Sequence, residues 1–124
     1  MSDINRIDTG KRMSQVVTHG GVVYLSGITP NDPAQAIKGQ TQQVLNKIDA
    51  FLAKAGIDKR RLLSAHILLR DIERDFEGMN EVWEAWIAPG HAPTRATSEA
   101  KLARASLLVE IIVTAAAAES APAA

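Results

Sequence analysis

The sequence predicts a single α+β domain, in which a mixed β-sheet carries two helices on one face. The chain has 124 residues and 46% of them are hydrophobic, so it is long enough to form one domain with a substantial core. Short apolar runs bounded by Gly, Pro and Asn indicate strands, and two longer stretches with helical periodicity indicate helices. The expected order of elements is β-β-β-α-β-α-β-β.

Three strands are expected before the first helix. The second and third flank His19, Gly20 and Gly21, which form a hairpin signal because glycine readily adopts the positive φ of a tight turn. Gly27 ends the third strand, and a turn-rich connection with two prolines follows it. The expected strands cover residues 4–8, 13–19 and 22–26.

The first helix is expected over residues 36–55. Val44, Ile48 and Leu52 form part of one apolar stripe at helical spacing, and Gly56 is the expected stop just beyond the helix end.

A strand over residues 63–69 separates this helix from a second one, which is expected from Phe76 to Trp86. Asp75 is the expected N-cap, because an aspartate side chain accepts hydrogen bonds from the free N–H groups of a first helical turn.

The last two strands are expected over residues 94–100 and 107–115. Strands that are apolar on both faces are normally buried on both faces, and two helices cover only one face of this sheet. We therefore expect another subunit to cover the second face. The two faces of the final strand consist of Leu107, Val109, Ile111 and Val113 on one side and of Leu108, Glu110, Ile112 and Thr114 on the other. The domain is expected to span residues 1–115, followed by a disordered Ala-rich tail over residues 116–124.

The overall composition argues against several classes of function. With 14 basic and 14 acidic residues the formal net charge is zero, whereas proteins that bind nucleic acid usually carry a basic excess. The absence of cysteine excludes disulfides, thiolate metal sites and cysteine nucleophiles. No secretory signal is apparent, and no apolar run approaches the ~20 residues that a membrane helix needs. We expect a cytoplasmic protein with no membrane or nucleic-acid partner.

Arg95 and Glu110 are the strongest candidates for functional residues. Glu110 interrupts a run of aliphatic residues, and a charge in such surroundings is costly unless it is paired or used. Arg95 begins a predicted strand, and its planar guanidinium can hold a carboxylate through two parallel hydrogen bonds. We expect the two side chains to come from neighbouring strands and to converge on a crevice that only assembly creates. Structural salt bridges are the alternative for both residues.

Four segments in the chain order resemble motifs of the Rid (reactive intermediate deaminase) family, also called RidA or YjgF-like. The resemblance covers roughly residues 12–115, and the spacing between Arg95 and Glu110 also agrees. The four segments are Tyr-Leu-Ser-Gly-Ile-Thr-Pro at 24–30, Asp-Phe-Glu-Gly-Met-Asn at 75–80, Pro-Thr-Arg at 93–95 and Leu-Val-Glu-Ile at 108–111.

This resemblance implies a chorismate-mutase-like fold, assembled as a homotrimer with ligand clefts between subunits. It further implies hydrolysis of 2-imino and enamine acids to 2-oxo acids and ammonia, without a metal or an organic cofactor. Arg95 would bind the carboxylate, and Glu110 would orient water or transfer protons. Met13 stands where the family archetype has a tyrosine and Thr97 where it has a cysteine, so the preferred substrate is left open. The expected binding residues besides Arg95 are Met13, Tyr24, Ser26, Gly27, Ile28, Asn80 and Thr97.

Two other functions are compatible with the same sequence. One is a non-catalytic trimer that senses small carboxylates through the same cleft, and the other is a ribonuclease or translation inhibitor. The three histidines show no metal-ligand spacing, so no metal site is expected.

Overall fold

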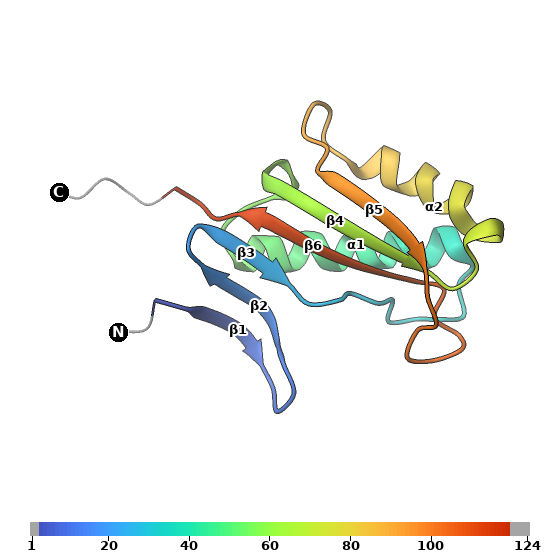
Figure 1. Ribbon diagram of the computed structural model, residues 1–124, viewed down its shortest axis with the longest axis horizontal. Coiled ribbons are helices and arrows are strands. Elements are labelled where there is room, and N and C mark those ends of the chain that lie inside the picture. The colour runs from blue at the N-terminus through green and yellow to red at the C-terminus, as the bar shows by residue number, and fades with distance from the viewer. Residues whose placement is uncertain (1–2, 120–124) are drawn as a thin grey trace.

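The computed structural model describes residues 3–119 and confirms an α+β fold in which two helices pack on one face of a six-stranded sheet (Figure 1). The order of elements along the chain is the predicted one, with a short 3-10 helix before the fourth strand. The elements are β1 (Asn5–Thr9), β2 (Ser14–His19), β3 (Val22–Leu25), α1 (Ile37–Lys54), η1 (Lys59–Arg61), β4 (Leu62–Leu69), α2 (Ile72–Trp86), β5 (Thr94–Glu99) and β6 (Val109–Ala116).

The strands lie in the order β1-β2-β3-β6-β4-β5. Every neighbouring pair is antiparallel except β4 and β5, which are parallel because α2 carries the chain back between them. The last strand therefore lies inside the sheet between β3 and β4, and β5 forms an edge.

The hairpin between β2 and β3 forms as predicted. Gly20 and Gly21 have φ values of 59° and 82°, and both lie in the left-handed region that a two-residue hairpin turn requires. Beyond β3, the backbone groups of Ile28 and Ile111 exchange two hydrogen bonds of 2.9 and 3.0 Å. This pairing ties the connection after β3 to the central strand.

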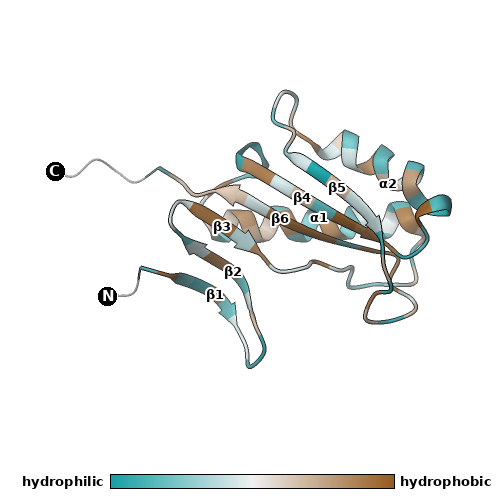
Figure 2. Ribbon diagram, viewed as in Figure 1, coloured by the Kyte–Doolittle hydropathy of each residue, from teal (hydrophilic) through white to brown (hydrophobic). Residues whose placement is uncertain are grey.

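The core lies between α1, α2 and one face of the sheet. On β6 the alternate residues Val109, Ile111 and Val113 are at most 1% exposed, whereas Glu110 and Ile112 between them are only half-buried. Burying each such aliphatic side chain contributes about 1.5–3 kcal/mol. The predicted alternation of the final strand is therefore confirmed, and among residues 3–119 no helix lies over its second face (Figure 2).

The start of α2 corrects one expectation. The helix begins at Ile72, and its N-cap is Asp71, whose carboxylate accepts a hydrogen bond from the Arg74 N–H at 3.1 Å. Asp75 lies one turn inside the helix, 3% exposed, and accepts hydrogen bonds of 3.0 and 2.9 Å from the Arg74 guanidinium. Two aspartates four residues apart both fit the capping pattern. The residues on either side of Asp71 are held by tertiary hydrogen bonds, in which the Arg70 N–H donates to the Leu108 carbonyl at 3.0 Å and the Ile72 N–H to Glu99 Oε2 at 3.1 Å.

The C-terminal strand extends slightly beyond the expected boundary. Ala116 still belongs to β6, and the Ala117 N–H donates to the Gly21 carbonyl at 2.9 Å. The Arg61 guanidinium donates to the carbonyls of Ala116 and Ala117 at 3.0 and 2.7 Å. Residues 120–124 of the expected tail lie outside the described residues.

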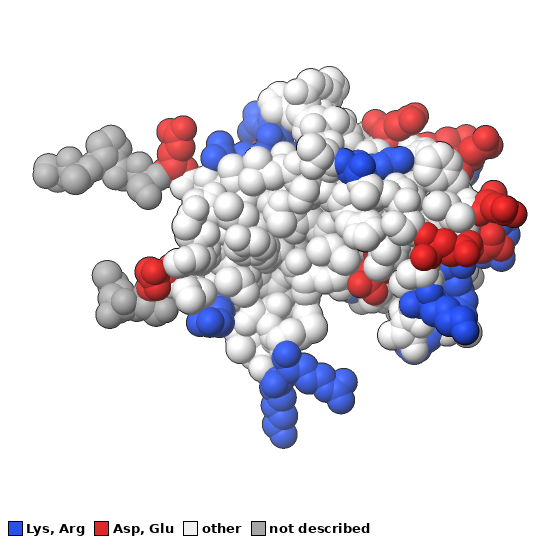
Figure 3. All heavy atoms as spheres, viewed as in Figure 1, with Lys and Arg blue, Asp and Glu red and all other residues white. Residues whose placement is uncertain are grey.

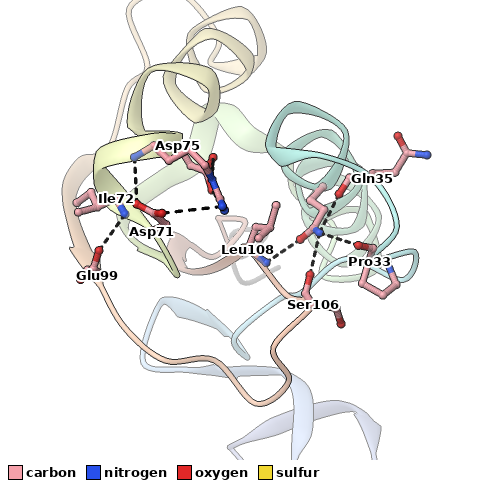
Figure 4. A network of polar contacts seen from close by, with 10 residues as sticks. Pro33, Gln35, Asp71, Ile72, Asp75, Glu99, Ser106 and Leu108 are labelled. Atoms are coloured by element: carbon pink, nitrogen blue, oxygen red, sulfur yellow. Dashed lines mark hydrogen bonds and ion pairs between the residues drawn. The ribbon is translucent and has the colours of Figure 1, made fainter.

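A fully buried glutamine, Gln40 in the first turn of α1, joins the loops on either side of the central strand. Its side-chain N–H₂ lies within 3.0–3.1 Å of three carbonyl oxygens, and its oxygen accepts the Leu108 N–H at 2.8 Å. Figure 4 shows these segments converging on one amide. Gln40 thus holds in place the residues just before Glu110 and the loop that follows Ile28. The three carbonyls belong to Pro33, Gln35 and Ser106.

Replacing Gln40 by methionine should destabilise the protein by about 2–3 kcal/mol, because a side chain of similar shape leaves the Leu108 N–H and several carbonyls without partners. Chemical denaturation at a fixed protein concentration measures this loss. Gln42→Met is the matched control, since Gln42 is an exposed residue of the same helix that bonds only to Asn46. Equal unfolding midpoints for the two variants would contradict the role assigned to Gln40.

Candidate functional site

Arg95 lies on the edge strand β5 and points toward α2. It is in register with Ala65, a core residue of β4, and it therefore belongs to the helix-covered face. Its Nη1 donates to Asn80 Oδ1 at 2.6 Å, and its Cζ lies 5.8 Å from the ring centre of Trp83 and 6.0 Å from that of Phe76. Partial burial lowers the pKa of Arg95, and the nearby Glu84 carboxylate opposes this shift.

Glu110 lies on the central strand and belongs to the opposite, open face. It is in register with Leu68, while its neighbours Val109 and Ile111 point into the core. A Cβ atom added to Gly27 would lie 2.9 Å from Glu110 Cδ and closer still to one carboxylate oxygen. The carboxylate thus rests directly on the Gly27 backbone, where only glycine leaves room.

In the described part of the chain, the Glu110 carboxylate has no polar partner. No hydrogen bond or ion pair within residues 3–119 reaches it, although the side chain is half-buried. Its oxygens are therefore available to a water molecule, a ligand or another chain.

Several expected binding residues lie on the same side as Glu110. The Ser26 hydroxyl donates to Gln15 Oε1 at 2.6 Å, so its oxygen still has room to accept a hydrogen bond. Tyr24 is 47% exposed and is in register with Thr114, which shares the open face with Glu110. Gly27 follows directly, but Ile28 corrects the expectation: its side chain is 2% exposed and belongs to the core, and its backbone N–H and C=O both pair with Ile111. Met13, just before β2, is also 47% exposed.

Thr97 belongs with Arg95 instead. It is in register with Ile67 of the core, and its hydroxyl oxygen is buried without a hydrogen-bond partner. The expected site residues therefore divide into two groups, which we call half-sites. The first, on the α2–β5 edge, consists of Asn80, Arg95 and Thr97; the second, on the open face, consists of Tyr24, Ser26, Gly27 and Glu110. Ile28 is a core residue and belongs to neither.

Arg95 and Glu110 do not meet within one chain, and their strands are not the neighbours that the sequence suggested. β4 lies between β5 and β6, and the two side chains leave opposite faces of the sheet. The physical reason is register, because strand alternation places Ala65 with Arg95 but Leu68 with Glu110. Two surface hollows, of about 540 and 400 Å³, are lined by neither residue.

Three residues near the half-sites have roles that the sequence did not predict. The sequence placed Phe76 and Trp83 within the second helix without a role at the site, but both rings flank Arg95. The available signal was their spacing, since Phe76, Asn80 and Trp83 recur at i, i+4 and i+7 on one helical stripe. Gln15 also escaped notice, and no local pattern identifies it as the partner of Ser26.

Residues 3–119 contain no group of three or more His, Cys, Asp or Glu side chains arranged to hold a metal ion. Neither helix in this part of the chain combines the length and the hydropathy needed to cross a bilayer.

Comparison with known proteins agrees with the motifs. A family model described as endoribonuclease L-PSP matches residues 3–117. A RutC family protein of Haemophilus ducreyi is 44% identical over 113 residues, covering 91% of this chain and 96% of that protein. The RutC family protein YoaB of Escherichia coli is 43% identical over 113 residues, covering 91% and 97%.

A solved structure of similar fold is NMB1025, a member of the YjgF protein family from Neisseria meningitidis. It superposes with a TM-score of 0.91 at 42% identity, covering 95% of this chain and 98% of that one. The fold and the ordered motifs thus define a small α+β protein of the YjgF type. The chain belongs to the endoribonuclease L-PSP family, which is the RidA/YjgF-like family that the motifs indicated.

Gly27→Ala should displace the Glu110 carboxylate, because the new methyl group occupies its place. Because the atoms in the way are the end of a flexible, half-buried side chain, we expect Glu110 to adopt another rotamer, which a crystal structure would show, at a cost of about 1 kcal/mol or less in unfolding free energy. Thermal or chemical unfolding measures this cost. Gly10→Ala is the matched control, since a Cβ there meets nothing closer than the Met13 carbonyl at 3.9 Å. If the Glu110 side chain kept its position in Gly27→Ala, the close contact between Gly27 and Glu110 would be wrong.

Proposed function

We propose that the chain forms a homotrimer and hydrolyses reactive 2-imino and enamine acids to 2-oxo acids and ammonia. Arg95 of one subunit binds the substrate carboxylate, and Glu110 of the neighbouring subunit orients water and transfers protons. The observation that carries this proposal is the separation of the two half-sites onto opposite faces of one sheet. An assembly that apposes the α2–β5 edge of one subunit to the open face of the next unites them.

The open face supports self-association. It exposes Tyr24 and half-exposes Ile112 and Leu68, although the other side of the same sheet is covered by helices. Figure 3 shows that this face bears few charged side chains over its middle, with most charges at the rim. A zero net charge adds little repulsion between copies of the chain.

The proposed hydrolysis requires only two groups of the protein, the Arg95 guanidinium and the Glu110 carboxylate. A protonated imine is already electrophilic at C2, so the main requirements are a fixed substrate and an oriented water molecule. The water oxygen adds to C2 while Glu110 accepts a proton from it. Glu110 then returns the proton to nitrogen. As the C–N bond breaks, the hydroxyl of the carbinolamine gives its proton to Glu110 and becomes the carbonyl of the 2-oxo acid, and the departing ammonia takes up this proton as ammonium. The reaction consumes one water and needs no redox partner.

A ribonuclease is the second candidate, because the matching family model is described as an endoribonuclease. The described chain offers little support for it beyond that description. His66 bonds to Ser98 and His91 to the Pro89 carbonyl, while His19 lies near Asp3, so the three imidazoles occupy three separate elements. RNA cleavage that persists in Arg95→Ala after rigorous repurification would favour this candidate.

Arg95→Ala should keep the oligomeric state and lose at least about 100-fold in kcat/KM for imine hydrolysis. The reason is that the variant lacks the guanidinium that pairs with the substrate carboxylate. The assay generates 2-iminopropionate with a serine dehydratase and traps the imine that survives. Arg95→Lys should recover little, since an ammonium cannot form two parallel bonds. Binding of 2-oxo acids by the parent protein without imine loss would favour a non-catalytic carboxylate sensor.

Mixed oligomers test whether the half-sites act between subunits. Arg95→Ala and Glu110→Gln are each expected to be inactive, but co-assembly in equal amounts should restore about a quarter of the parent activity, because random neighbours unite an intact arginine with an intact glutamate at that frequency. Sites within one chain would recover nothing. The control mixes the double variant with the parent protein, where an inter-subunit site again predicts about a quarter and a site within one chain predicts about a half.

A further inference from the structure

Three side chains on one stripe of α2 contact the Arg95 guanidinium. These are Phe76, Asn80 and Trp83, which we call the Arg95 cradle. Their i, i+4, i+7 spacing places them in line along the helix beside β5. Asn80 Oδ1 accepts a hydrogen bond from Arg95 Nη1 at 2.6 Å. The two rings lie 6.0 and 5.8 Å from Cζ, within the range of a cation–π contact.

Each contact limits a different freedom of the guanidinium. The hydrogen bond to Asn80 fixes the rotation of the planar guanidinium about its own axis. The two aromatic rings limit its sideways movement. A guanidinium has five N–H donors in one plane, and Asn80 engages the Nη1 side. No other side-chain or backbone acceptor within residues 3–119 bonds to the Arg95 guanidinium. The edge formed by Nε and Nη2 therefore remains open, and this is one edge that can hold a carboxylate side-on.

The cradle orients the charge without neutralising it. No carboxylate in the described chain forms an ion pair with Arg95, and the acceptor that holds it is a neutral amide. Trp83 is 5% exposed and Phe76 is 39% exposed, so ring faces replace part of the water around the guanidinium. Partial burial accordingly lowers the pKa of Arg95, although a guanidinium stays charged at neutral pH.

We infer that Phe76, Asn80 and Trp83 are positioning residues, which hold Arg95 in the orientation that receives a carboxylate without touching the substrate themselves. This inference rests on the carboxylate-binding half of the proposed function. It reassigns Asn80 from direct substrate binding to orientation of the arginine. The alternative is that the three side chains only pack α2 against β5.

Asn80→Asp is the most discriminating variant. The aspartate has almost the same shape but carries a negative charge, so it pairs with the guanidinium and competes with the substrate carboxylate. We expect KM to rise by about tenfold or more while kcat changes little, because the lost interaction contributes equally to the ground state and the transition state. Asn80→Ala, which frees Nη1 but leaves the charge, should raise KM less.

Trp83 allows a paired comparison. Trp83→Phe keeps an aromatic face and should retain most of the affinity, whereas Trp83→Leu fills the site with an aliphatic group and should raise KM by about three- to tenfold. Trp86→Phe is the matched control on the same helix. Trp86 donates to Asp49 at 3.0 Å, lies under Lys59 and packs against Trp83 with 5.5 Å between ring centres. This change therefore removes a hydrogen bond and some of the packing behind Trp83, but it keeps all three cradle side chains.

The Trp86→Phe protein also leaves Trp83 as the sole tryptophan, since the chain has two. A titration with pyruvate, a 2-oxo acid that carries the carboxylate but not the imine, should then change the Trp83 emission. The same titration of Trp86→Phe combined with Arg95→Ala should show no change. Calorimetry measures the pyruvate affinity of every variant independently of turnover.

These readouts separate the inference from the proposed function. The cradle is supported if Asn80→Asp and Trp83→Leu weaken pyruvate binding while Trp86→Phe does not, even if no protein in the series hydrolyses an imine. The cradle is overturned if both variants bind pyruvate as the parent does and lose only thermal stability. It is equally overturned if the parent binds no pyruvate, or if Arg95→Ala leaves pyruvate binding unchanged while imine hydrolysis proceeds.

Discussion

The rest of the structure depends on the alternation of side chains along the central strand β6. Its odd-numbered residues from Val109 to Ala115 are almost completely buried under the helices, and the residues between them face away from the core. A shift of one residue would expose the aliphatic set and bury the Glu110 carboxylate without a partner, which costs several kcal/mol on both counts. The hydrophobic core therefore fixes the position of the acid. The same constraint separates Glu110 from Arg95, whose register with Ala65 assigns it to the helix-covered face.

Each half-site is stabilised by local contacts that leave its functional atoms free. Glu110 rests on Gly27, and the paired backbone groups of Ile28 and Ile111 keep this glycine in place. Gln40 adds a second restraint, because its buried amide bonds to the loops before and after this region. On the opposite edge, Arg95 is oriented by an amide and two rings rather than by a carboxylate. Both charged groups thus lack an oppositely charged partner within residues 3–119. The packing around them offsets the free-energy cost of partly burying such a group.

Family membership and geometry bear on different parts of the functional question. The match over residues 3–117 and the similarity to NMB1025 show which family this is and which fold it has. They do not by themselves assign a reaction, since relatives share a fold far more widely than a chemistry. The geometry adds the condition under which the two charged residues could form one site. An acid and a guanidinium on opposite faces can act on one small molecule only if a second copy of the chain brings them together.

The sequence by itself determined the order of elements, the hairpin at Gly20 and Gly21, the stop at Gly56 and the alternation of the last strand. These features follow from local periodicity and from backbone conformations that glycine favours. It also singled out Glu110, because a charge among aliphatic residues is conspicuous in any context, and Arg95, because a guanidinium at the start of a strand can hold a carboxylate. Only the tertiary structure decided the strand order, the choice of Asp71 over Asp75 as the N-cap, and the separation of the two charges by β4. Strand order and register arise from pairing between distant segments, and the energies that select them come from burial across the sheet rather than from neighbours in the chain.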